Sequence, residues 1–562
     1  MLIIIPMSGV GNRFMQAGYS DPKPLINVDG KPIIEHVVNL FPGEHNFIFI
    51  CNQEHLQTTE MYNVLRRIAP SGTIVSIPKH KNGPVYAVSK VFNLIDNDEE
   101  VIVNYCDFSM YWDYNNFLHH TRTRNADGAI PAYKGFHPHM LHDPNYAFIK
   151  DQNQWLLEIK EKAPFTTNKT NEYASTGAYY FKRGSLLKKY FPELIERDIN
   201  VNGEYYVSLI YNLLKRDGLN VSVYEVQHML QWGTPEDLEE YVGWSAYFKR
   251  AAEQVEQKKI THDLMLIPLA GRGQRFVQDG YADPKPLIPV SGKPMIVQAA
   301  ASLPATTEQI FVCLNEHCQR YPLEHAIKET YPHAEIKKLD HVTEGQACTC
   351  EFGLQNIDPE KSLVIGACDN GMLWNQQKYQ DLVDDKSVDV IAWSFRNHPS
   401  SNKNPQMYGW LAVDHNNVVT NVSVKVPLSA NPSHDHAIVG TFTFKKAAYF
   451  LQAAQNLRAK NIRVNNEFYV DSCINQALAM GLTVKVFEVD HYVCWGTPND
   501  LRTFEYWQSF FHKCTWHPYR LEKDATVAPE KIAELDMKYR MFTQPNREPL
   551  VTGKQQQVSQ AL

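Results

Sequence analysis

The sequence predicts an α/β fold in two tandem domains, each a mostly parallel mixed sheet flanked by helices. Residues 6–32, PMSGVGNRFMQAGYSDPKPLINVDGKP, recur as PLAGRGQRFVQDGYADPKPLIPVSGKP at 268–294, with 18 of 27 positions identical. Apolar runs of strand length, such as 2–5 and 101–103, alternate with segments of helical periodicity, such as 32–40. A strand, helix, strand rhythm is typical of right-handed crossovers and a parallel sheet.

The duplication predicts the domain boundaries. Two repeats of about 250 residues match the size at which a single hydrophobic core stops growing. We therefore expect one domain at 1–249 and a second at 263–515, joined by a charged helical linker at 250–262. The extension at 516–562 loses periodicity, and its end, Thr-Gly-Lys-Gln-Gln-Gln at 552–557, predicts partial disorder.

Composition excludes several classes of function. A formal net charge of −7 argues against a general grip on nucleic acid, which needs a basic excess. The ten cysteines show no CxxC pair or zinc spacing, and we expect reduced thiols in a cytoplasmic protein. No apolar stretch approaches the length of a membrane helix, and no basic region precedes the first apolar run as in a signal peptide. A homo-oligomer remains open.

A glycine-rich loop follows the first apolar strand in each repeat. Such a loop lets backbone N–H groups approach an anionic ligand without side-chain obstruction, and a helix N-terminus after it adds positive potential. The pattern therefore predicts a phosphate site. The predicted nucleotide-binding residues are Ser8, Gly9 and Gly11 in the first repeat, and Ala270, Gly271 and Gly273 in the second.

Two cations follow the loop in each repeat. Arg13 and Arg275 supply a planar guanidinium that is always charged, and Lys23 and Lys285 each lie between two prolines that stiffen the chain. Two cations beside a backbone cradle suit a triphosphate. These four residues are therefore predicted to bind phosphate.

A carboxylate stands at the tip of one buried strand in each repeat. Asp107 follows the run at 101–103, and Asp369 follows the run at 363–365. A carboxylate there is costly to desolvate unless it is paired, and a hard cation that bridges it to phosphate oxygens would compensate it. The recurrence favours Mg²⁺ at both positions. An aspartate that caps the next helix is the alternative.

A second loop with a conserved spacing contains Gly83 in the first repeat and Gly345 in the second. A glycine at this position would allow close approach to a flat nucleotide base, and the two loops differ around it, which suggests different ligands or drift in one half. The alternative is a glycine at an ordinary helix start.

These motifs together resemble the sugar-phosphate nucleotidyltransferase family, the nucleotide-sugar pyrophosphorylases. The signature is a glycine-rich loop ending in an arginine, then Pro-Lys-Pro-Leu, then Gly-Lys-Pro, and it is present in both repeats. By contrast, the third glycine of the dinucleotide-binding fingerprint is replaced by Phe14 and Phe276. The resemblance implies two tandem Rossmann-like nucleotidyltransferase domains.

The resemblance also implies the reaction and its participants. A phosphate oxygen of a sugar phosphate attacks the α-phosphorus of a nucleoside triphosphate, giving a nucleotide sugar and pyrophosphate, with Mg²⁺ as cofactor. The resemblance implies that Arg13, Lys23, Arg275 and Lys285 are catalytic. The arginines would hold the triphosphate, and the proline-flanked lysines would stabilise the α-phosphoryl oxygens. The implied substrate-binding residues are Glu161, Lys162 and Gly177 in the first repeat, and Lys425 and Gly440 in the second.

The chain departs from the family pattern at one metal position. Many members carry a second metal-binding aspartate two residues before a late Gly-Thr, where this chain has Gln231 and Cys494. Glu204 and Glu467, present in both repeats, are possible replacement carboxylates or ordinary residues at a helix start. Val424 stands in the second repeat where Glu161 stands in the first, which favours the first half as the usual kind of enzyme.

Three functions are compatible with the sequence. The first is synthesis of activated sugars for a surface polysaccharide, by one or both halves. The second is cytidylyl transfer to a non-sugar phosphate such as phosphocholine. The third is a binding or regulatory role for one half, against which the complete sets of arginine and lysine in both repeats argue.

Overall fold

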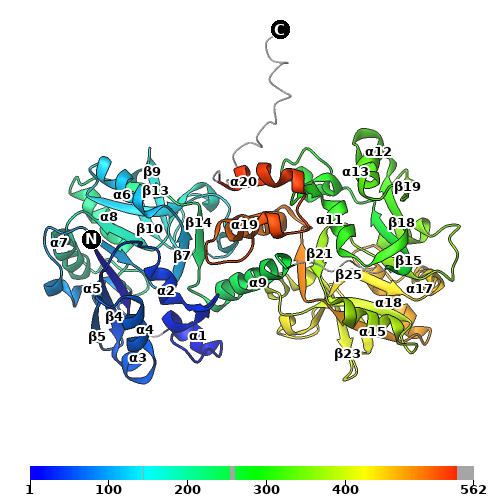
Figure 1. Ribbon diagram of the computed structural model, residues 1–562, viewed down its shortest axis with the longest axis horizontal. Helices are drawn as coiled ribbons and strands as arrows, with labels where there is room; N and C mark the ends of the chain where they lie inside the picture. The colour runs from blue at the N-terminus through cyan, green and yellow to red at the C-terminus, as the bar shows by residue number, and fades with distance from the viewer. Residues whose placement is uncertain (10, 144, 254–259, 541–562) are drawn as a thin grey trace, which may run out of the picture. The chain divides into compact units, whose positions relative to one another are not determined.

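The computed structural model describes residues 1–9, 11–143, 145–253 and 260–540 (Figure 1). The chain divides into two compact units. The first unit takes the described residues of 1–242, 514–516 and 538–540, and the second takes those of 243–513 and 517–537. Each unit contains a mixed sheet flanked by helices, which confirms the α/β class.

The elements of the first unit alternate between strands and helices along most of the chain. Its strands are β1 (Leu2–Met7), β2 (Asn27–Val28), β3 (Lys31–Pro32), β4 (Asn46–Asn52), β5 (Thr73–Ile77), β6 (Val101–Asn104), β7 (Phe108–Tyr111), β8 (Gly128–Tyr133), β9 (Ala147–Gln152), β10 (Trp155–Glu161), β11 (Tyr173–Ser175), β12 (Ala178–Phe181), β13 (Val221–Glu225) and β14 (His228–Gln231). Its helices are α1 (Asn12–Gln16), α2 (Ile33–Val38), α3 (Gln53–Thr58), α4 (Met61–Ile68), α5 (Gly83–Ser89), α6 (Tyr114–Thr123), α7 (Gly184–Glu196), α8 (Val207–Arg216) and the start of α9 (Pro235–Ala251), with short 3₁₀ turns η1 (Lys23–Leu25), η2 (Phe92–Leu94), η3 (Pro138–Leu141) and η4 (Lys169–Asn171).

The main sheet of the first unit has a parallel core with antiparallel additions. Its strand order is β11-β9-β10-β13-β8-β12-β6-β1-β4-β5. β1 pairs in parallel with β4 and β6, whereas β12 joins β6 and β8 in antiparallel fashion. The carboxyl ends of β1 and β6 therefore meet at one edge of the sheet, where ligands bind in folds of this kind.

Both faces of this parallel core are covered. All six residues of β1 are buried, so its side chains pack on both sides of the sheet. On one face Leu2 and Ile4 join a cluster with Val85 of α5 and Ile210 of α8. A strand buried on both faces reads as a continuous apolar run, which explains why β1 and β6 are evident in the sequence.

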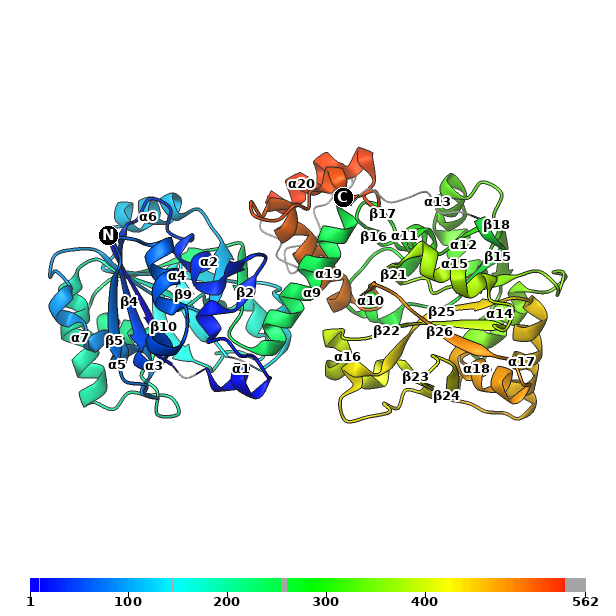
Figure 2. The ribbon, with the colours of Figure 1, turned by 60° about the horizontal axis from the view of Figure 1, so that its bottom comes forward.

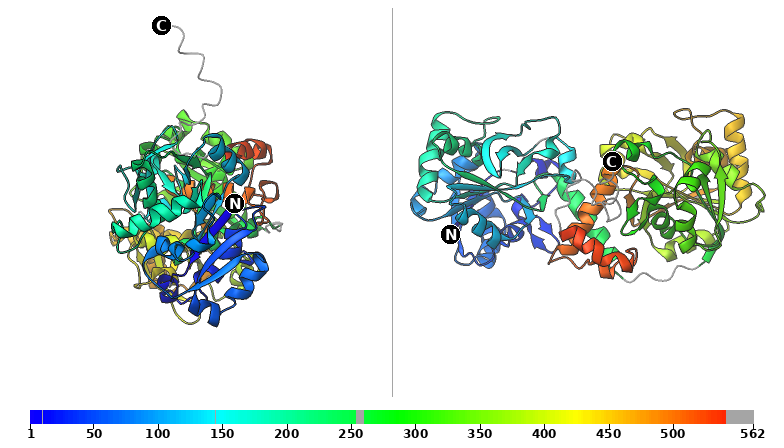
Figure 3. Two further views of the ribbon diagram at one scale, coloured as in Figure 1. Left: turned by 90° about the vertical axis from the view of Figure 1, so that its left-hand side faces the viewer. Right: turned by 90° about the horizontal axis from the view of Figure 1, so that it is seen from above.

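The second unit repeats this organisation. Its main sheet has the order β19-β18-β15-β20-β25-β22-β26, with β23 paired to β24 and β25. Figures 2 and 3 allow the helices around its strands to be followed from other directions. Its strands are β15 (Ile260–Leu269), β16 (Pro289–Val290), β17 (Lys293–Pro294), β18 (Ala305–Leu314), β19 (Glu335–Leu339), β20 (Leu363–Ile365), β21 (Asn370–Leu373), β22 (Val390–Phe395), β23 (Gly409–Val413), β24 (Val419–Val424), β25 (His436–Phe444), β26 (Val484–Glu488) and β27 (His491–Cys494).

The helices of the second unit lie between these strands in the chain, as in the first unit. They are α10 (Gln274–Gln278), α11 (Met295–Ser302), α12 (Asn315–Arg320), α13 (Leu323–Thr330), α14 (Gln346–Gly353), α15 (Gln376–Asp384), α16 (Pro399–Lys403), α17 (Ala447–Ala459), α18 (Val470–Ala479), α19 (Pro498–Lys513) and α20 (Ile532–Arg540), with 3₁₀ turns η5 (Lys285–Leu287), η6 (Pro405–Met407), η7 (Pro432–His434), η8 (Leu521–Lys523) and η9 (Pro529–Lys531). The last residues of α20 are grouped with the first unit.

The division between the units falls inside a helix, at residues 242 and 243, instead of at residue 249. The second part of α9 carries Trp244 and Phe248, whose rings pack against Phe504 of α19. These aromatic side chains assign the end of α9 to the second unit. Of the predicted linker at 250–262, residues 254–259 lie outside the described residues, and the last three already belong to β15.

The first part of the C-terminal extension is ordered, contrary to the loss of periodicity in its sequence. Residues 516–540 include α20 and two 3₁₀ turns. The backbone N–H of Ala528 donates to the carbonyl of Ser291, and the Gln298 side chain donates to the carbonyl of Thr526. Buried apolar side chains, among them Tyr519, Leu521 and Val527, and these hydrogen bonds hold the segment. The predicted disordered end at 552–557 lies outside the described residues.

Within the part of the chain that the structure describes, none of the helices combines the length and the apolar character that crossing a membrane requires.

Candidate active site

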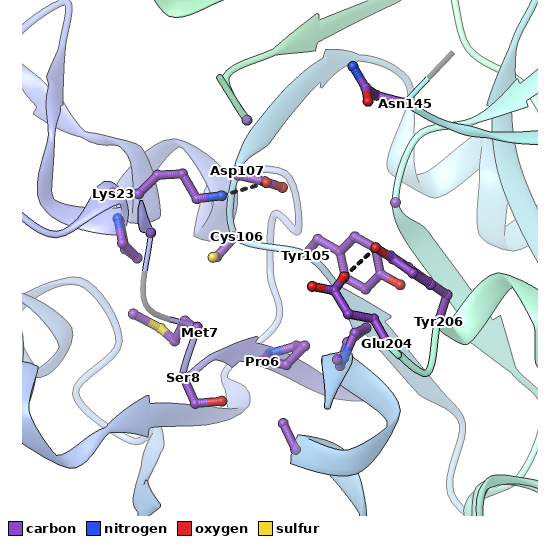
Figure 4. Close-up of a pocket in the computed structure, with 18 of the residues that line it drawn as sticks. Pro6, Met7, Ser8, Lys23, Tyr105, Cys106, Asp107, Asn145, Glu204 and Tyr206 are labelled. Atoms are coloured by element: carbon purple, nitrogen blue, oxygen red, sulfur yellow. Dashed lines mark hydrogen bonds and ion pairs between the residues drawn. The ribbon is translucent and has the colours of Figure 1, made fainter. Parts of the chain in front are cut away.

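The first unit contains a cavity of about 590 Å³ at the carboxyl ends of β1 and β6 (Figure 4). Segments from the whole unit contribute to its wall, from the loop after β1 to the end of β14. Every site residue predicted for the first half lines it: Ser8, Gly9, Gly11, Arg13, Lys23, Gly83, Asp107, Glu161, Lys162, Gly177 and Glu204.

The glycine-rich loop forms one side of this cavity. Gly11 has a φ of 67°, in the left-handed region, and precedes the short helix α1, which carries Arg13. A Cβ at Gly9 would meet nothing within 4 Å, so the loop is open toward a ligand. The hydroxyl of Ser8 is hydrogen-bonded to Nε2 of His80 at 2.9 Å, which fixes the start of the loop. Arg13 itself is exposed at the cavity wall.

Lys23 and Asp107 form an ion pair in this cavity. Nζ of Lys23 donates to Oδ2 of Asp107 at 2.7 Å, and the side chains are only 20% and 28% exposed. Burial by itself would lower the pKa of Lys23, but the Asp107 carboxylate outweighs it, and the pKa is raised. Lys23 is therefore held as a cation with its ammonium directed into the cavity.

A hydrogen-bonded chain of three side chains lines the opposite side. Nζ of Lys162 donates to the hydroxyl of Tyr206 at 2.7 Å, and that hydroxyl donates to the carboxylate of Glu204. Lys162 follows β10 with a φ of 57°, a left-handed conformation that a non-glycine residue adopts at some cost. Such a backbone at a cavity wall is typical of a residue whose side chain is positioned for binding.

Glu161 ends β10 next to this chain. Its carboxylate accepts a hydrogen bond from Oγ of Ser208 on α8 at 2.6 Å. Burial raises the pKa of Glu161 to about 7, against the opposing effects of the Ser208 hydrogen bond and the Lys162 ammonium. The cavity thus has the glycine-rich loop at one end. At the other end it has one cation, Lys162, and two carboxyl groups, those of Glu161 and Glu204.

The second unit reproduces the central ion pair. Nζ of Lys285 donates to Oδ2 of Asp369, and the two side chains are 17% and 28% exposed. The Asp369 carboxylate again raises the pKa of the lysine, although burial acts in the opposite direction.

Lys425, the counterpart of Lys162 in the second unit, has different partners. Lys425 has a φ of 64°, like Lys162, but its Nζ donates to the backbone carbonyl of Met407. Burial lowers the pKa of Lys425, the Asp471 carboxylate opposes this, and the Arg275 guanidinium adds to the lowering. The Glu467 carboxylate also acts on Lys425 and raises its pKa. These predicted cations and carboxylates therefore lie close to one another.

The loop and glycine positions of the second unit follow those of the first. A Cβ at Gly271 would meet nothing within 4 Å. At Gly273, where φ is 60°, a Cβ would lie 2.9 Å from Cβ of Lys285. Ala270 is buried after β15, and Gly440 has a φ of 92° in β25.

The conformation of Gly83 and Gly345 is explained by the chain itself. At Gly83, where φ is 82°, a Cβ would lie 2.7 Å from the backbone N of Tyr205 and 2.8 Å from its carbonyl oxygen. A Cβ at Gly345 would overlap the backbone of Phe468 in the same way. The close approach that the sequence attributes to a nucleotide base is made by the chain's own backbone, although Gly83 also lines the cavity.

This contact predicts a stability effect of Gly83→Ala. We expect the substitution to destabilise the first unit by about 1–2 kcal/mol, because a side chain there combines a left-handed φ with a backbone clash. Thermal unfolding measures the effect. Gly9→Ala is the matched control, since its Cβ would enter open space, and equal unfolding midpoints for the two variants would contradict the assignment.

The residues at Asp107 fit a magnesium ion that is shared with a ligand. Among the described residues no group of three or more His, Cys, Asp or Glu side chains could hold a metal ion. Mg²⁺ is commonly held by one or two carboxylates together with substrate phosphates and water. A Cβ at Gly233 would lie 2.8 Å from the Gln231 amide nitrogen and 3.1 Å from Oδ2 of Asp107, so these side chains converge. Glu204 instead accepts from Tyr206.

For Mg²⁺, the second unit offers a poorer second ligand in Cys494 than the first unit offers in Gln231. The thiol of Cys494 donates to Asp500 at 3.6 Å, and burial raises its pKa. A neutral thiol is a soft group that does not suit Mg²⁺. Asp369 is therefore the residue of this half that fits the ion.

Sequence reasoning missed several residues of the first cavity. Tyr206 lines the cavity and accepts a hydrogen bond from Lys162, whereas Ser208 is not among the lining residues and donates a hydrogen bond to Glu161. Tyr206 had a usable signal, since the segment Asn-Gly-Glu-Tyr-Tyr-Val at 202–207 recurs with Tyr469 in the second repeat. Tyr105 and His80 also line the cavity, but no repeat pattern marks them.

Comparison with known proteins finds one family model that matches the first half of the chain. Residues 3–200 match the model of the nucleotidyl transferase family, which is 198 of the 562 residues. No curated protein matched the chain. Among solved structures, the chain is similar to a nucleoside-diphosphate-sugar pyrophosphorylase from Vibrio cholerae RC9, at 20% identity and a TM-score of 0.36 over 43% of this chain and 99% of that one. It is also similar to an inositol-1-phosphate CTP transferase from T. maritima, at 13% identity and 0.36 over 45% and 96%.

Proposed function

We propose that the first half transfers a nucleotidyl group from a nucleoside triphosphate to a sugar phosphate, giving a nucleotide sugar and pyrophosphate. The observation that carries this proposal is the single cavity that joins the glycine-rich loop, the Lys23–Asp107 pair and Lys162. A loop with accessible backbone N–H groups and two separate cations suits two phosphate groups that must react with each other.

The reaction follows from the chemistry of the two anions. An oxygen of the acceptor phosphate forms a bond to the α-phosphorus, and the bond from this phosphorus to the bridging oxygen breaks, so pyrophosphate leaves with the electron pair. A phosphate monoester is largely ionised near neutral pH, and no general base is needed. The task of the protein is to align the groups and to stabilise charge in the transition state.

The residues divide this task by their position in the cavity. Arg13, on the loop side, would hold the triphosphate, and Lys162, on the opposite side, would hold the acceptor phosphate. The ammonium of Lys23 has three donors, one of which binds Asp107, so others remain for the α-phosphoryl oxygens. Asp107 would also hold Mg²⁺, whose charge offsets that of the phosphates.

We propose the same chemistry for the second half. Arg275, Lys285, Asp369 and Lys425 would take the corresponding roles, and the Lys285–Asp369 ion pair supports this. A nucleotide-activated sugar is the form that glycosyl transfer into a surface polysaccharide would consume, and we propose this use for the product.

Pyrophosphate release tests the proposed function. Purified protein with Mg²⁺ is mixed with each common nucleoside triphosphate and a panel of hexose 1-phosphates, inositol 1-phosphate and phosphocholine. We expect release that requires both a triphosphate and an acceptor, and removal of Mg²⁺ with EDTA should abolish it. Release with phosphocholine alone would favour the non-sugar alternative, and no release with any pair would contradict the proposal.

A further inference from the structure

The two halves differ at three neighbouring positions close to the lysine that is proposed to hold the acceptor phosphate, and the three differences depend on one another. In the first unit Glu161 of β10 pairs across the strands with Ala147 of β9. In the second unit Val424 of β24 pairs in the same way with Gly409 of β23. The carboxylate of the strand is therefore lost in the second half, and a methyl group opposite it is lost as well.

The helix beside these strands carries the third change. Ser208 is the second residue of α8 and donates to Glu161 in the first unit. The second residue of the corresponding helix α18 is Asp471. The first half has a carboxylate on the strand and a hydroxyl on the helix, whereas the second half has an apolar strand residue and a carboxylate on the helix.

Gly409 makes room for the relocated carboxylate. A Cβ at Gly409 would overlap Oδ2 of Asp471 and would lie 2.9 Å from Cδ1 of Ile438. The alanine found at this position in the first half would thus collide with an aspartate at 471. The three differences fit one another, which is not expected of a site that has drifted after losing its ligand.

The relocated carboxylate acts electrostatically on the lysine that is proposed to hold the acceptor phosphate. Asp471 is the leading charged neighbour of Lys425, and Arg275, Glu467 and Asp369 follow. Among the described residues, no side chain donates a hydrogen bond to Asp471, whereas Glu161 receives one from Ser208. The donor that Asp471 does have is its own backbone N–H, so its carboxylate oxygens can still accept a hydrogen bond from a hydroxyl of a bound ligand.

We propose that Asp471 binds a carbon-bound hydroxyl group of the acceptor molecule in the second half. The two halves would therefore select different hydroxylated phosphate monoesters. The proposal rests on the proposed function, because it assigns Lys425 to the acceptor phosphate. A carboxylate is an acceptor only, so it selects a ligand group that donates. An aspartate on a helix and a glutamate on a strand would present this acceptor from different directions.

The test isolates the second half in the full-length chain by Lys23→Ala. In this background Asp471→Asn should raise the KM for the preferred hexose 1-phosphate at least 10-fold and leave the KM for the triphosphate within 2-fold. Asp381→Asn, which changes an exposed carboxylate on α15, is the control and should leave both unchanged. An unchanged acceptor KM in Asp471→Asn would overturn the proposal.

Binding by calorimetry separates this proposal from the reaction. The hexose 1-phosphate panel and methyl phosphate, which carries no carbon-bound hydroxyl, serve as probes. Asp471→Asn should weaken binding of the preferred hexose 1-phosphate at least 10-fold and leave methyl phosphate unaffected. This result without pyrophosphate release would refute the reaction and retain the subsite. Equal weakening of both probes would refute the role of Asp471 toward the hydroxyl.

Rebuilding the first-half arrangement provides the second variant. The triple exchange Gly409→Ala, Val424→Glu and Asp471→Ser places a glutamate on the strand and a hydroxyl on the helix. We expect it to shift the acceptor preference of the second half toward that of the first half. An active triple variant that keeps the original acceptor preference of the second half would contradict the proposal.

Discussion

Lys23→Ala should lower pyrophosphate release by the first half at least 100-fold. The ammonium of Lys23 lies in the cavity, bound to Asp107 at 2.7 Å, where it would meet the charge that develops on the α-phosphoryl oxygens. Removal of one such preorganised donor from an active site typically costs about 100-fold or more in rate, or about 3 kcal/mol. Initial rates of pyrophosphate release measure the loss.

The corresponding change in the other half assigns each activity. Lys285→Ala should abolish the activity of the second half and leave that of the first unchanged. Lys189→Ala and Lys446→Ala are matched controls, because these lysines pair with carboxylates on the surface, Lys189 in the first unit and Lys446 in the second. Wild-type release by the double variant of Lys23 and Lys285 would show that neither ion pair lies at the reaction site.

A stability control separates a catalytic from a structural role of Lys23. Lys23→Ala leaves Asp107 without its cation, so some loss of stability is expected from an uncompensated carboxylate. Lys23→Ala with Asp107→Asn removes both charges. Asp107 is itself proposed to hold Mg²⁺, so the double variant reports on stability only, and we expect its unfolding midpoint to recover. A Lys23→Ala protein that is folded at the assay temperature and yet inactive has lost a catalytic group and not its fold.

The parts of the fold and site that could be predicted are those with a one-dimensional signal. The buried strand β1 is a continuous apolar run, and the loop after it has glycines at a fixed spacing. Asp107 could be identified because a charge at the end of such a run is unusual, and its counterpart Asp369 recurs. The structure then brings Lys23 and Asp107 together although 84 positions separate them in the chain.

The parts that could not be predicted depend on contacts between distant segments. The backbone of Tyr205 requires a glycine at position 83, and no local sequence pattern around Gly83 shows this tertiary contact. The antiparallel insertion of β12 between β6 and β8 follows from pairing that no local pattern encodes.

A comparison of aligned positions also fails when a group moves to a different element. Val424 in place of Glu161 reads as loss of a carboxylate if only this strand is compared. The structure shows a carboxylate on the neighbouring helix at Asp471, with Gly409 opposite. A comparison of the two halves therefore has to include the helix next to the strand, and not the aligned strand positions alone.

Glu161→Gln should make the first unit more stable relative to wild type as the pH rises from 5 to 8. Burial raises the folded-state pKa of Glu161 to about 7, above its usual value of 4.5. Stability from this group is therefore fully present below the unfolded-state pKa and is lost as the pH rises through about 7, because the folded protein then holds an ionised carboxylate that the unfolded chain solvates better. A neutral glutamine does not titrate.

The expected difference is about 2 kcal/mol between the two pH values, less than the full shift implies because the carboxylate is open to the cavity. For a unit of this size the midpoint of unfolding should move by about 4–8 °C in favour of the variant. Glu158→Gln, on the same strand but 49% exposed, should follow the wild-type pH profile and is the control. Parallel profiles for Glu161→Gln and wild type would mean that the cavity does not hold this carboxyl group in its protonated form, and that Glu161 faces an acceptor hydroxyl as a carboxylate throughout this pH range.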